Sequence, residues 1–213
     1  MAIPLPKLDY EGLFPDPRMF KSKSSFVAAG FDVKQAASHN IMVGAHPSAG
    51  PYLFKKYNNS VPLDEQQENY ETRVRGSAKI REVIDRYRLQ HLIVPHKWLY
   101  ELPKKFSERR QSAYVLVVER IDLVSVDESA RRYRNISPAV LEDLCHVLFR
   151  FRGFDAAIHN LRFTPSGQIS FIDTESWARN QRPGTRVFRR IDEELTRESR
   201  KRVERMFEKL DDD

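Results

Sequence analysis

The residues best suited to chemistry are Asp155, Asn160 and Asp173, which carry oxygen atoms and stand at short intervals in a chain of 213 residues. Asp155 follows a predicted apolar helix. Two short apolar segments around a turn at 164–168 predict a hairpin that returns Asp173 to the side of Asn160. An amide and a carboxylate at one point suit a hard divalent cation, which takes oxygen ligands and leaves room for phosphate oxygens. We therefore expect a metal site, with Asp155 one loop away and able to accept the proton of an attacking hydroxyl group.

Simpler interpretations exist for two of these residues. Asp173 could be a solvated carboxylate at the end of a strand, and Asn160 could be a turn residue that bonds its own backbone. Only the metal-site interpretation requires the hairpin to bring the two residues together.

The spacing of the three residues resembles the catalytic segment of the protein-kinase-like superfamily, which reads H-R-D-x-x-x-x-N, then a hairpin, then D-F-G. Here residues 153–160 read GFDAAIHN and residues 171–175 read FIDTE. The resemblance implies that Asp155 orients or deprotonates the acceptor hydroxyl, and that Asn160 and Asp173 hold Mg²⁺ against the phosphates of ATP. The His-Arg and Phe-Gly pairs of the family are replaced, and no glycine-rich loop is recognisable.

The upstream half extends the resemblance to a lysine and a glutamate. In the family, a strand lysine pairs with a helix glutamate and holds the nucleotide phosphates. The segment 52–57 resembles that strand, and Lys55 is preferred to Lys56 because it shares a strand face with Leu53 and Tyr57. Residues 63–89 have the period of an amphipathic helix and place Glu71 beside the first buried turn, with Glu82 as the alternative.

The apolar segment 114–119 resembles the last strand of the small lobe, which leads into the hinge between the two lobes of the family. On this resemblance, the backbone groups of Glu119 and Ile121 would hold the adenine ring of ATP.

These patterns predict an α+β protein with the two-lobed protein-kinase-like fold. We expect an irregular segment over 1–25, followed by a small lobe over 26–122 with an antiparallel sheet and one helix. A mainly helical lobe should occupy 123–213, with a charged helix over 191–210. This second lobe is shorter than the resemblance implies and lacks the usual shelf for a peptide substrate.

Composition limits the function classes. The net charge is +6, but acidic residues interrupt the arginine-rich stretch 186–205, so nucleic-acid binding is not favoured. A polyanionic activator is an idea supported by the basic charge alone. The single cysteine excludes an internal disulfide, and no apolar run approaches the ~20 residues of a membrane span. We expect a soluble cytoplasmic protein; a stripped-down kinase-like chain would also suit a bacterial effector delivered into a host cell.

The leading interpretation is an ATP- and Mg²⁺-dependent phosphotransferase whose acceptor is a protein hydroxyl or a small molecule. The alternatives are a pseudokinase that acts through a partner, and adenylyl transfer on the same fold. The altered catalytic loop favours the pseudokinase, whereas the retention of Asp155, Asn160 and Asp173 favours the enzyme.

Overall fold

The structure is a computed structural model of the chain. It describes residues 3–35, 41–57, 61–107, 113–151, 156–174, 191 and 193–212. The chain divides into two compact units, of which the first comprises Met1–Val74 with His96–Arg120 and the second Arg75–Pro95 with Ile121–Asp213. The sequence-based division at residue 122 differs from this one chiefly because the second unit takes residues 75–95, including half of one long helix.

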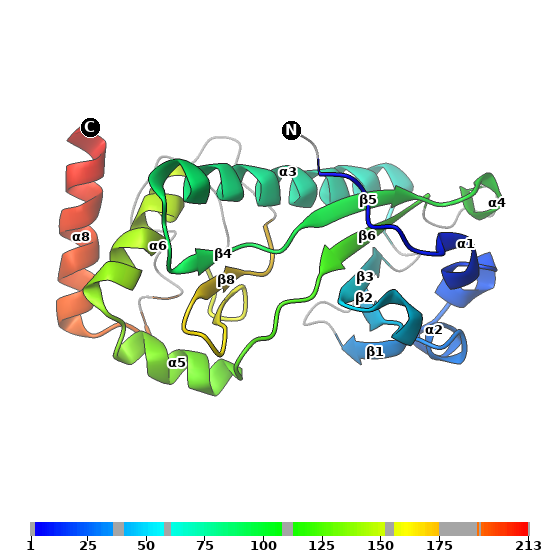
Figure 1. Cartoon of the computed structure of the whole chain (residues 1–213), viewed down its shortest axis with the longest axis horizontal. Helices are drawn as coiled ribbons and strands as arrows, with labels where there is room; N and C mark the ends of the chain where they lie inside the picture. The colour runs from blue at the N-terminus through cyan, green and yellow to red at the C-terminus, as the bar shows by residue number, and fades with distance from the viewer. Residues whose placement is uncertain are drawn as a thin grey trace. The chain divides into compact units, whose positions relative to one another are not determined.

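The first unit contains a five-stranded antiparallel sheet with the strand order β1-β2-β3-β6-β5 (Figure 1). Its strands are β1 (Asp32–Gln35), β2 (Ile41–Ala45), β3 (Tyr52–Tyr57), β5 (Lys97–Glu101) and β6 (Tyr114–Glu119). The first turns of helix α3 (Leu63–Tyr87) pack on one sheet face through a small cluster built around Tyr57, Tyr70 and Leu116. Side chains that alternate with these, including Phe54 and Val117, point to the other face because successive strand residues alternate.

Three short helices cover that second face: α1 (Tyr10–Leu13), the 3-10 helix η1 (Pro17–Phe20) and α2 (Lys23–Ala28). The prediction of an irregular segment over 1–25 is therefore wrong for residues 10–13, 17–20 and 23–25, which are helical. The prolines in this region suggested breaks, but Pro17 occupies a first-turn position where a missing N–H costs nothing. Asp9 and Ser22 cap their helices by accepting hydrogen bonds from backbone N–H groups.

Two further features differ from expectation, because the sequence by itself predicts a strand over 91–95 and then a polar, basic loop that leads to the strand over 114–119. The basic loop expected after residue 95 contains strand β5, which pairs with β6 along its whole length, and a single helical turn, α4 (Lys104–Ser107). The strand expected over 91–95 is reduced to β4 (Leu92–Ile93), which lies in the second unit and pairs there in parallel with β8 (Ile169–Phe171). Strand pairing is set by long-range contacts, which local alternation cannot assign.

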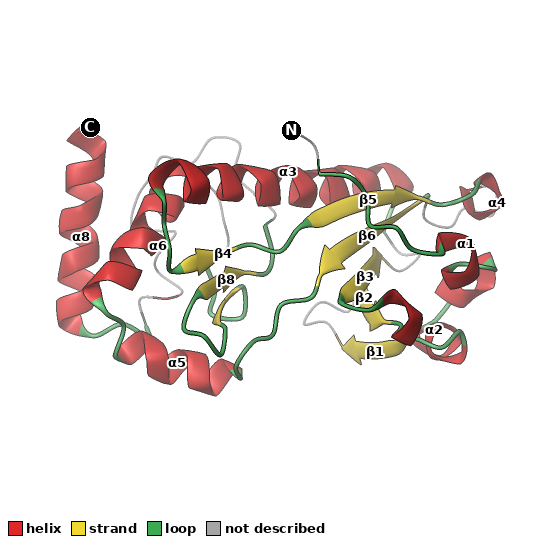
Figure 2. Cartoon of the chain, in the orientation of Figure 1, coloured by secondary structure: helices red, strands yellow, loops and turns green. Residues whose placement is uncertain are grey.

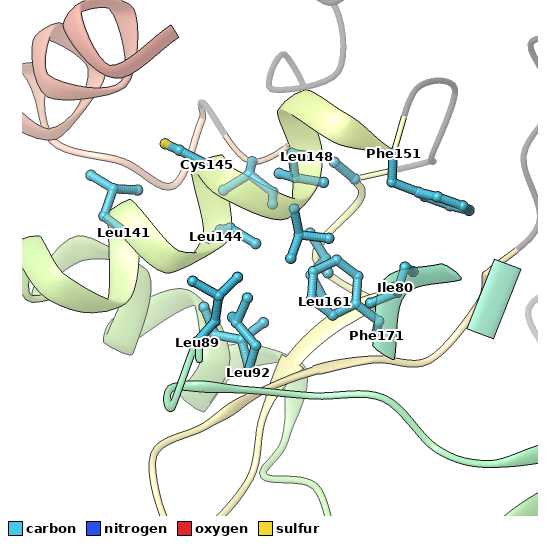
Figure 3. Packing of buried hydrophobic residues seen from close by; sticks show 14 of the residues in the cluster. Ile80, Leu89, Leu92, Leu141, Leu144, Cys145, Leu148, Phe151, Leu161 and Phe171 are labelled. Atoms are coloured by element: carbon cyan, nitrogen blue, oxygen red, sulfur yellow. The ribbon is translucent and has the colours of Figure 1, made fainter. Parts of the chain in front are cut away.

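The second unit is mainly helical around a three-stranded sheet with the order β4-β8-β7 (Figure 2). Its other elements are α5 (Val126–Arg134), α6 (Pro138–Arg150), β7 (Leu161–Phe163), β8 (Ile169–Phe171) and α8 (Arg197–Asp212). Helix α6 begins at Pro138, because Ser137 caps it and a proline is tolerated at the first helical position. Its apolar face packs against the hairpin: Leu144 and Leu148 belong to the same buried cluster as Leu161 and Phe171 (Figure 3).

The mixed α+β composition and the antiparallel sheet agree with the predicted α+β class, and the two-lobed protein-kinase-like architecture stays a prediction. Among the residues that the structure describes, no helix combines the length and the apolar character that crossing a bilayer requires.

Candidate functional site

The β7–β8 hairpin forms as predicted and places Asn160 and Asp173 at one end. Leu161 pairs with Phe171, and the backbone N–H of Ile172 donates to the carbonyl oxygen of Asn160 at 2.8 Å. Asp173 is the next residue, so Asn160 and Asp173 lie near each other at the open end of the hairpin. Asn160 is buried and Asp173 is half-buried. Binding of a metal ion at this point stays a prediction.

The hairpin is held rigidly by helix α5. The hydroxyl of Tyr133 donates to the carbonyl oxygen of Leu161 at 2.9 Å, and the N–H of Phe163 donates to Oγ of Ser129 at 3.2 Å. Arg132 donates from Nη1 to the carbonyl oxygen of Thr164 in the turn at 2.9 Å. Complete burial raises the pKa of Tyr133, so its hydroxyl remains a donor at any physiological pH. The end that carries Asn160 therefore rests on an anchored scaffold.

The loop that leads into Asn160 is compact. The N–H groups of Asn160 and Leu161 both donate to the carbonyl oxygen of Ala157, at 2.8 and 3.1 Å, and the side chain of Ala157 is buried. Asp155 lies outside the described residues, so its catalytic role remains a prediction from the sequence. Among the described residues there is no cluster of three or more His, Cys, Asp or Glu side chains suited to a metal ion.

Gly76 is a residue to which the sequence alone assigns no role. It lies in α3, where glycine ordinarily weakens a helix without ending it. In the structure a Cβ atom at this position would lie 2.0 Å from the carbonyl oxygen of Thr174 and 3.1 Å from Cζ of Phe151. The backbone that follows Asp173 therefore packs directly on α3, and Thr174 is fully buried. A glycine inside an otherwise continuous helical pattern is the signal that could have indicated this close approach.

The two neighbouring lysines of β3 have different environments. Lys55 is half-buried and lies opposite Leu116, on the sheet face that packs against α3. Lys56 points to the other face and is fully buried. Its Nζ donates to the carbonyl oxygen of Tyr57 at 2.5 Å and lies 5.0 Å from the centre of the Phe20 ring. Loss of hydration lowers the pKa of Lys56 to about 8. Lys56 is a core residue, which leaves Lys55 as the candidate for phosphate binding.

Glu71 is better placed than Glu82 to serve as the partner of Lys55. The hydroxyl of the adjacent Tyr70 accepts a hydrogen bond at 2.7 Å from the N–H of Tyr57, which attaches this turn of α3 to the end of β3. Glu71 is half-buried and accepts a hydrogen bond from Nε2 of Gln67 at 2.9 Å. Glu82 is exposed and belongs to the second unit. The pairing of Lys55 with Glu71 stays a prediction.

The residues proposed to hold adenine lie where the first unit ends and the second begins. Glu119 ends β6; its N–H donates to the carbonyl oxygen of His96 at 2.9 Å, and its Oε2 accepts from the N–H of His96 at 3.0 Å. Ile121 is the first residue of the second unit. Three residues later, the N–H of Val124 donates to the carbonyl oxygen of Phe163 at 2.9 Å, so the segment after Ile121 runs beside β7. Adenine binding by Glu119 and Ile121 stays a prediction.

Comparison with known proteins adds little to this geometry. No protein-family model matches the chain, and no curated protein matches it. Among the solved structures that match is a crystal structure of WbdD, with 14% sequence identity and a TM-score of 0.39. The match covers 67% of this chain and 31% of the WbdD chain, so this chain spans about a third of the length of WbdD. A similarity of this size assigns neither a family nor a function.

Proposed function

We propose that this chain is an ATP- and Mg²⁺-dependent phosphotransferase of the protein-kinase-like kind. The observation that carries the proposal is the hydrogen bond between Ile172 and Asn160, because it sets Asp173 beside Asn160 at the end of an anchored hairpin. An amide oxygen and a carboxylate supply ligands for Mg²⁺, and phosphate oxygens and water complete its shell.

Each remaining residue has a defined role in the proposal. Lys55, oriented by Glu71, neutralises charge on the phosphates, and the backbone of Glu119 and Ile121 holds the adenine ring. Asp155 orients the acceptor hydroxyl and takes its proton. Phosphoryl transfer depends mostly on positioning and on neutralisation of charge in the transition state, so these groups are sufficient without a covalent intermediate. The proposed acceptor is a protein hydroxyl.

The test is incubation of the full chain with γ-labelled ATP and Mg²⁺, with and without a cell extract. Wild type should transfer label to itself or to an extract protein, and Asp155→Ala should reduce the transfer by a factor of 100 or more. Asp85→Ala is the matched control, since Asp85 is an exposed carboxylate on α3 with no proposed role. Label transferred equally well by Asp155→Ala would contradict the proposal.

The alternatives give different results in companion assays. A pseudokinase would be stabilised by ATP with Mg²⁺ in thermal unfolding but would transfer no label. Adenylyl transfer would attach label from α-labelled ATP and not from γ-labelled ATP. If Asp173 binds Mg²⁺, Asp173→Ala should remove the Mg²⁺-dependent part of the thermal stabilisation, whether the chain is a kinase, a pseudokinase or an adenylyl transferase.

A further inference from the structure

A cavity of about 450 Å³ opens in the second unit where α5, the start of α6 and the turn of the β7–β8 hairpin come together. Phe163 and Gly167 line it from the hairpin. Because Phe163 ends β7 and Asn160 precedes that strand, the cavity lies at the turn end of the hairpin and Asn160 at the open end. The volume falls within the range of about 300–1,000 Å³ that is usual for ligand sites. The described lining includes none of the residues proposed for phosphoryl transfer.

Three apolar side chains line the cavity. Ile136, Val140 and Phe163 all belong to the buried cluster of the second unit or pack against it. Gly167 lies beside them with a φ angle of +92°, and a Cβ atom there would meet no atom of the described residues within 4 Å beyond its chain neighbours. The space beside the turn is therefore open. Since apolar surface is more stable away from water, the interior of the cavity favours an apolar group.

Arg132 gives the cavity a fixed wall. Its Nε donates to Oε1 of Glu128 at 2.9 Å, and its Nη1 donates to the carbonyl oxygen of Thr164 at 2.9 Å. Its guanidinium carbon lies 5.9 Å from the centre of the Phe163 ring. These contacts hold α5, the turn and the end of β7 in one arrangement. The cavity is therefore formed before a ligand binds, which reduces the entropy lost on binding.

The rim of the cavity carries excess positive charge. Nη2 of Arg131 lies 2.8 Å from Oε2 of Glu128, and Arg132 binds the other oxygen, so two cations share one carboxylate. The side chain of Arg131 is 69% exposed, and a guanidinium has five N–H donors, so it can contact a second carboxylate and keep Glu128. Ser137 caps α6 and also lines the cavity, where the helix dipole adds partial positive charge. An anionic group is therefore favoured at the rim.

We propose that this cavity docks a short segment of a partner protein in which a large apolar side chain stands beside one or two acidic residues. The apolar side chain enters the cavity, and a carboxylate contacts Arg131 at the rim. Apolar anchors in preformed pockets supply most of the affinity of such contacts, and charges at the rim supply selectivity. This docking does not depend on phosphoryl transfer, because a kinase, a pseudokinase and an adenylyl transferase would present the same surface.

The experiment selects random peptides displayed on phage against the immobilised full chain. The selection is repeated on Val140→Glu, which places a carboxylate in the wall of the cavity. This variant should fold, because a glutamate three residues after Ser137 completes a capping box at the start of α6. Wild type should enrich peptides with a large apolar residue next to Asp or Glu, and Val140→Glu should not enrich them.

The most enriched peptide is then synthesised, and its dissociation constant is measured by fluorescence polarisation. Arg131→Glu should weaken binding about tenfold, because it brings like charges together. Arg134→Glu is the matched control, since it makes the same change of charge at an exposed site of the same helix outside the cavity, and it should leave binding unchanged. Replacing the acidic residue of the peptide by lysine should restore binding to Arg131→Glu, which a merely structural effect would not do.

Three results would overturn the proposal: a wild-type chain that enriches no peptide, a peptide that binds Val140→Glu equally well, or equal losses in Arg131→Glu and Arg134→Glu. If no peptide is selected but the chain is retained on heparin and Arg131→Glu abolishes the retention, the rim binds a polyanion instead. The assays with labelled ATP are separate measurements, so a failure here leaves the proposed function standing.

Discussion

Replacing Lys56 by methionine should stabilise the protein, although it removes a hydrogen bond. The ammonium group is buried on the aromatic side of the sheet, and its pKa falls to about 8 from an ordinary value of 10.5. At pH 7 Lys56 is protonated in both the folded and the unfolded chain, so the full difference between its two pKa values reduces the free energy of unfolding. Each pKa unit corresponds to about 1.4 kcal/mol, which makes the cost on the order of 3 kcal/mol. Methionine fills a similar volume without a charge.

The pH dependence gives the sharper test. Above pH 8 the folded chain releases the Lys56 proton while the unfolded chain keeps it, so the wild type gains stability as pH rises toward 10.5. Methionine has no proton to lose. The advantage of Lys56→Met in urea unfolding should therefore fall from about 3 kcal/mol at pH 7 to about 1.5 kcal/mol at pH 9.5.

Lys55→Met is the matched control, since the two lysines are adjacent and face opposite sides of one strand. It should give no such pH-dependent gain in stability, but it should weaken binding of ATP with Mg²⁺. The reasoning is refuted if Lys56→Met destabilises the chain at pH 7, or if its advantage does not change between pH 7 and pH 9.5. An effect on ATP binding from Lys56 and none from Lys55 would reverse the assignment of the two residues.

Further outcomes are expected from the same structure. Gly76→Ala should destabilise the protein by about 1–3 kcal/mol in urea unfolding because the new Cβ atom would overlap with Thr174, although alanine is the better helix former. Ala78→Gly, at an exposed site of the same helix, measures the intrinsic cost of glycine. A stabilising effect of Gly76→Ala would contradict the close approach of Thr174 to α3. Asp173→Ala should lower the thermal stabilisation by ATP with Mg²⁺ to that seen with ATP and a chelator; an undiminished Mg²⁺ effect argues against the metal site. Cys145 is buried and its pKa is raised to about 12, so a thiol reagent at pH 8 should label it only after unfolding; rapid labelling of the native chain would show that α6 is not packed as described.

Much of the candidate site could be predicted from local patterns. The apolar period over 63–87 specifies helix α3, and the turn at 164–168 between two short apolar segments specifies the hairpin. A two-stranded antiparallel hairpin has one register for a given turn, so the approach of Asp173 to Asn160 follows from residues close together in the chain. Alternation along β3 likewise separates Lys55 from Lys56.

Other features depend on segments far apart in the chain, and no local pattern contains them. The short helices within residues 10–28 bury Phe14, Phe20 and Phe26 in one cluster with sheet residues such as Phe54, and the prolines of this segment do not reveal that packing. Residues 91–95 fall within the small lobe expected over 26–122, yet β4 pairs with β8, because the composition of a strand says nothing about its partner. Residue 155 lies outside the described part, so the proposed general base is still known only from its spacing.

The order of residue types along this chain was enough to predict the β7–β8 hairpin and the approach of Asp173 to Asn160, because helix period, strand alternation and turn composition act over a few residues. Packing between distant segments decided the rest. Lys56 lies against Phe20 of the 3-10 helix η1. The backbone at Thr174 leaves no space for a side chain at Gly76. The carbonyl oxygen of Val124 accepts a hydrogen bond from Arg162. These contacts form only when the chain has folded, since their free energy comes from surfaces that are separated by tens of residues in the sequence.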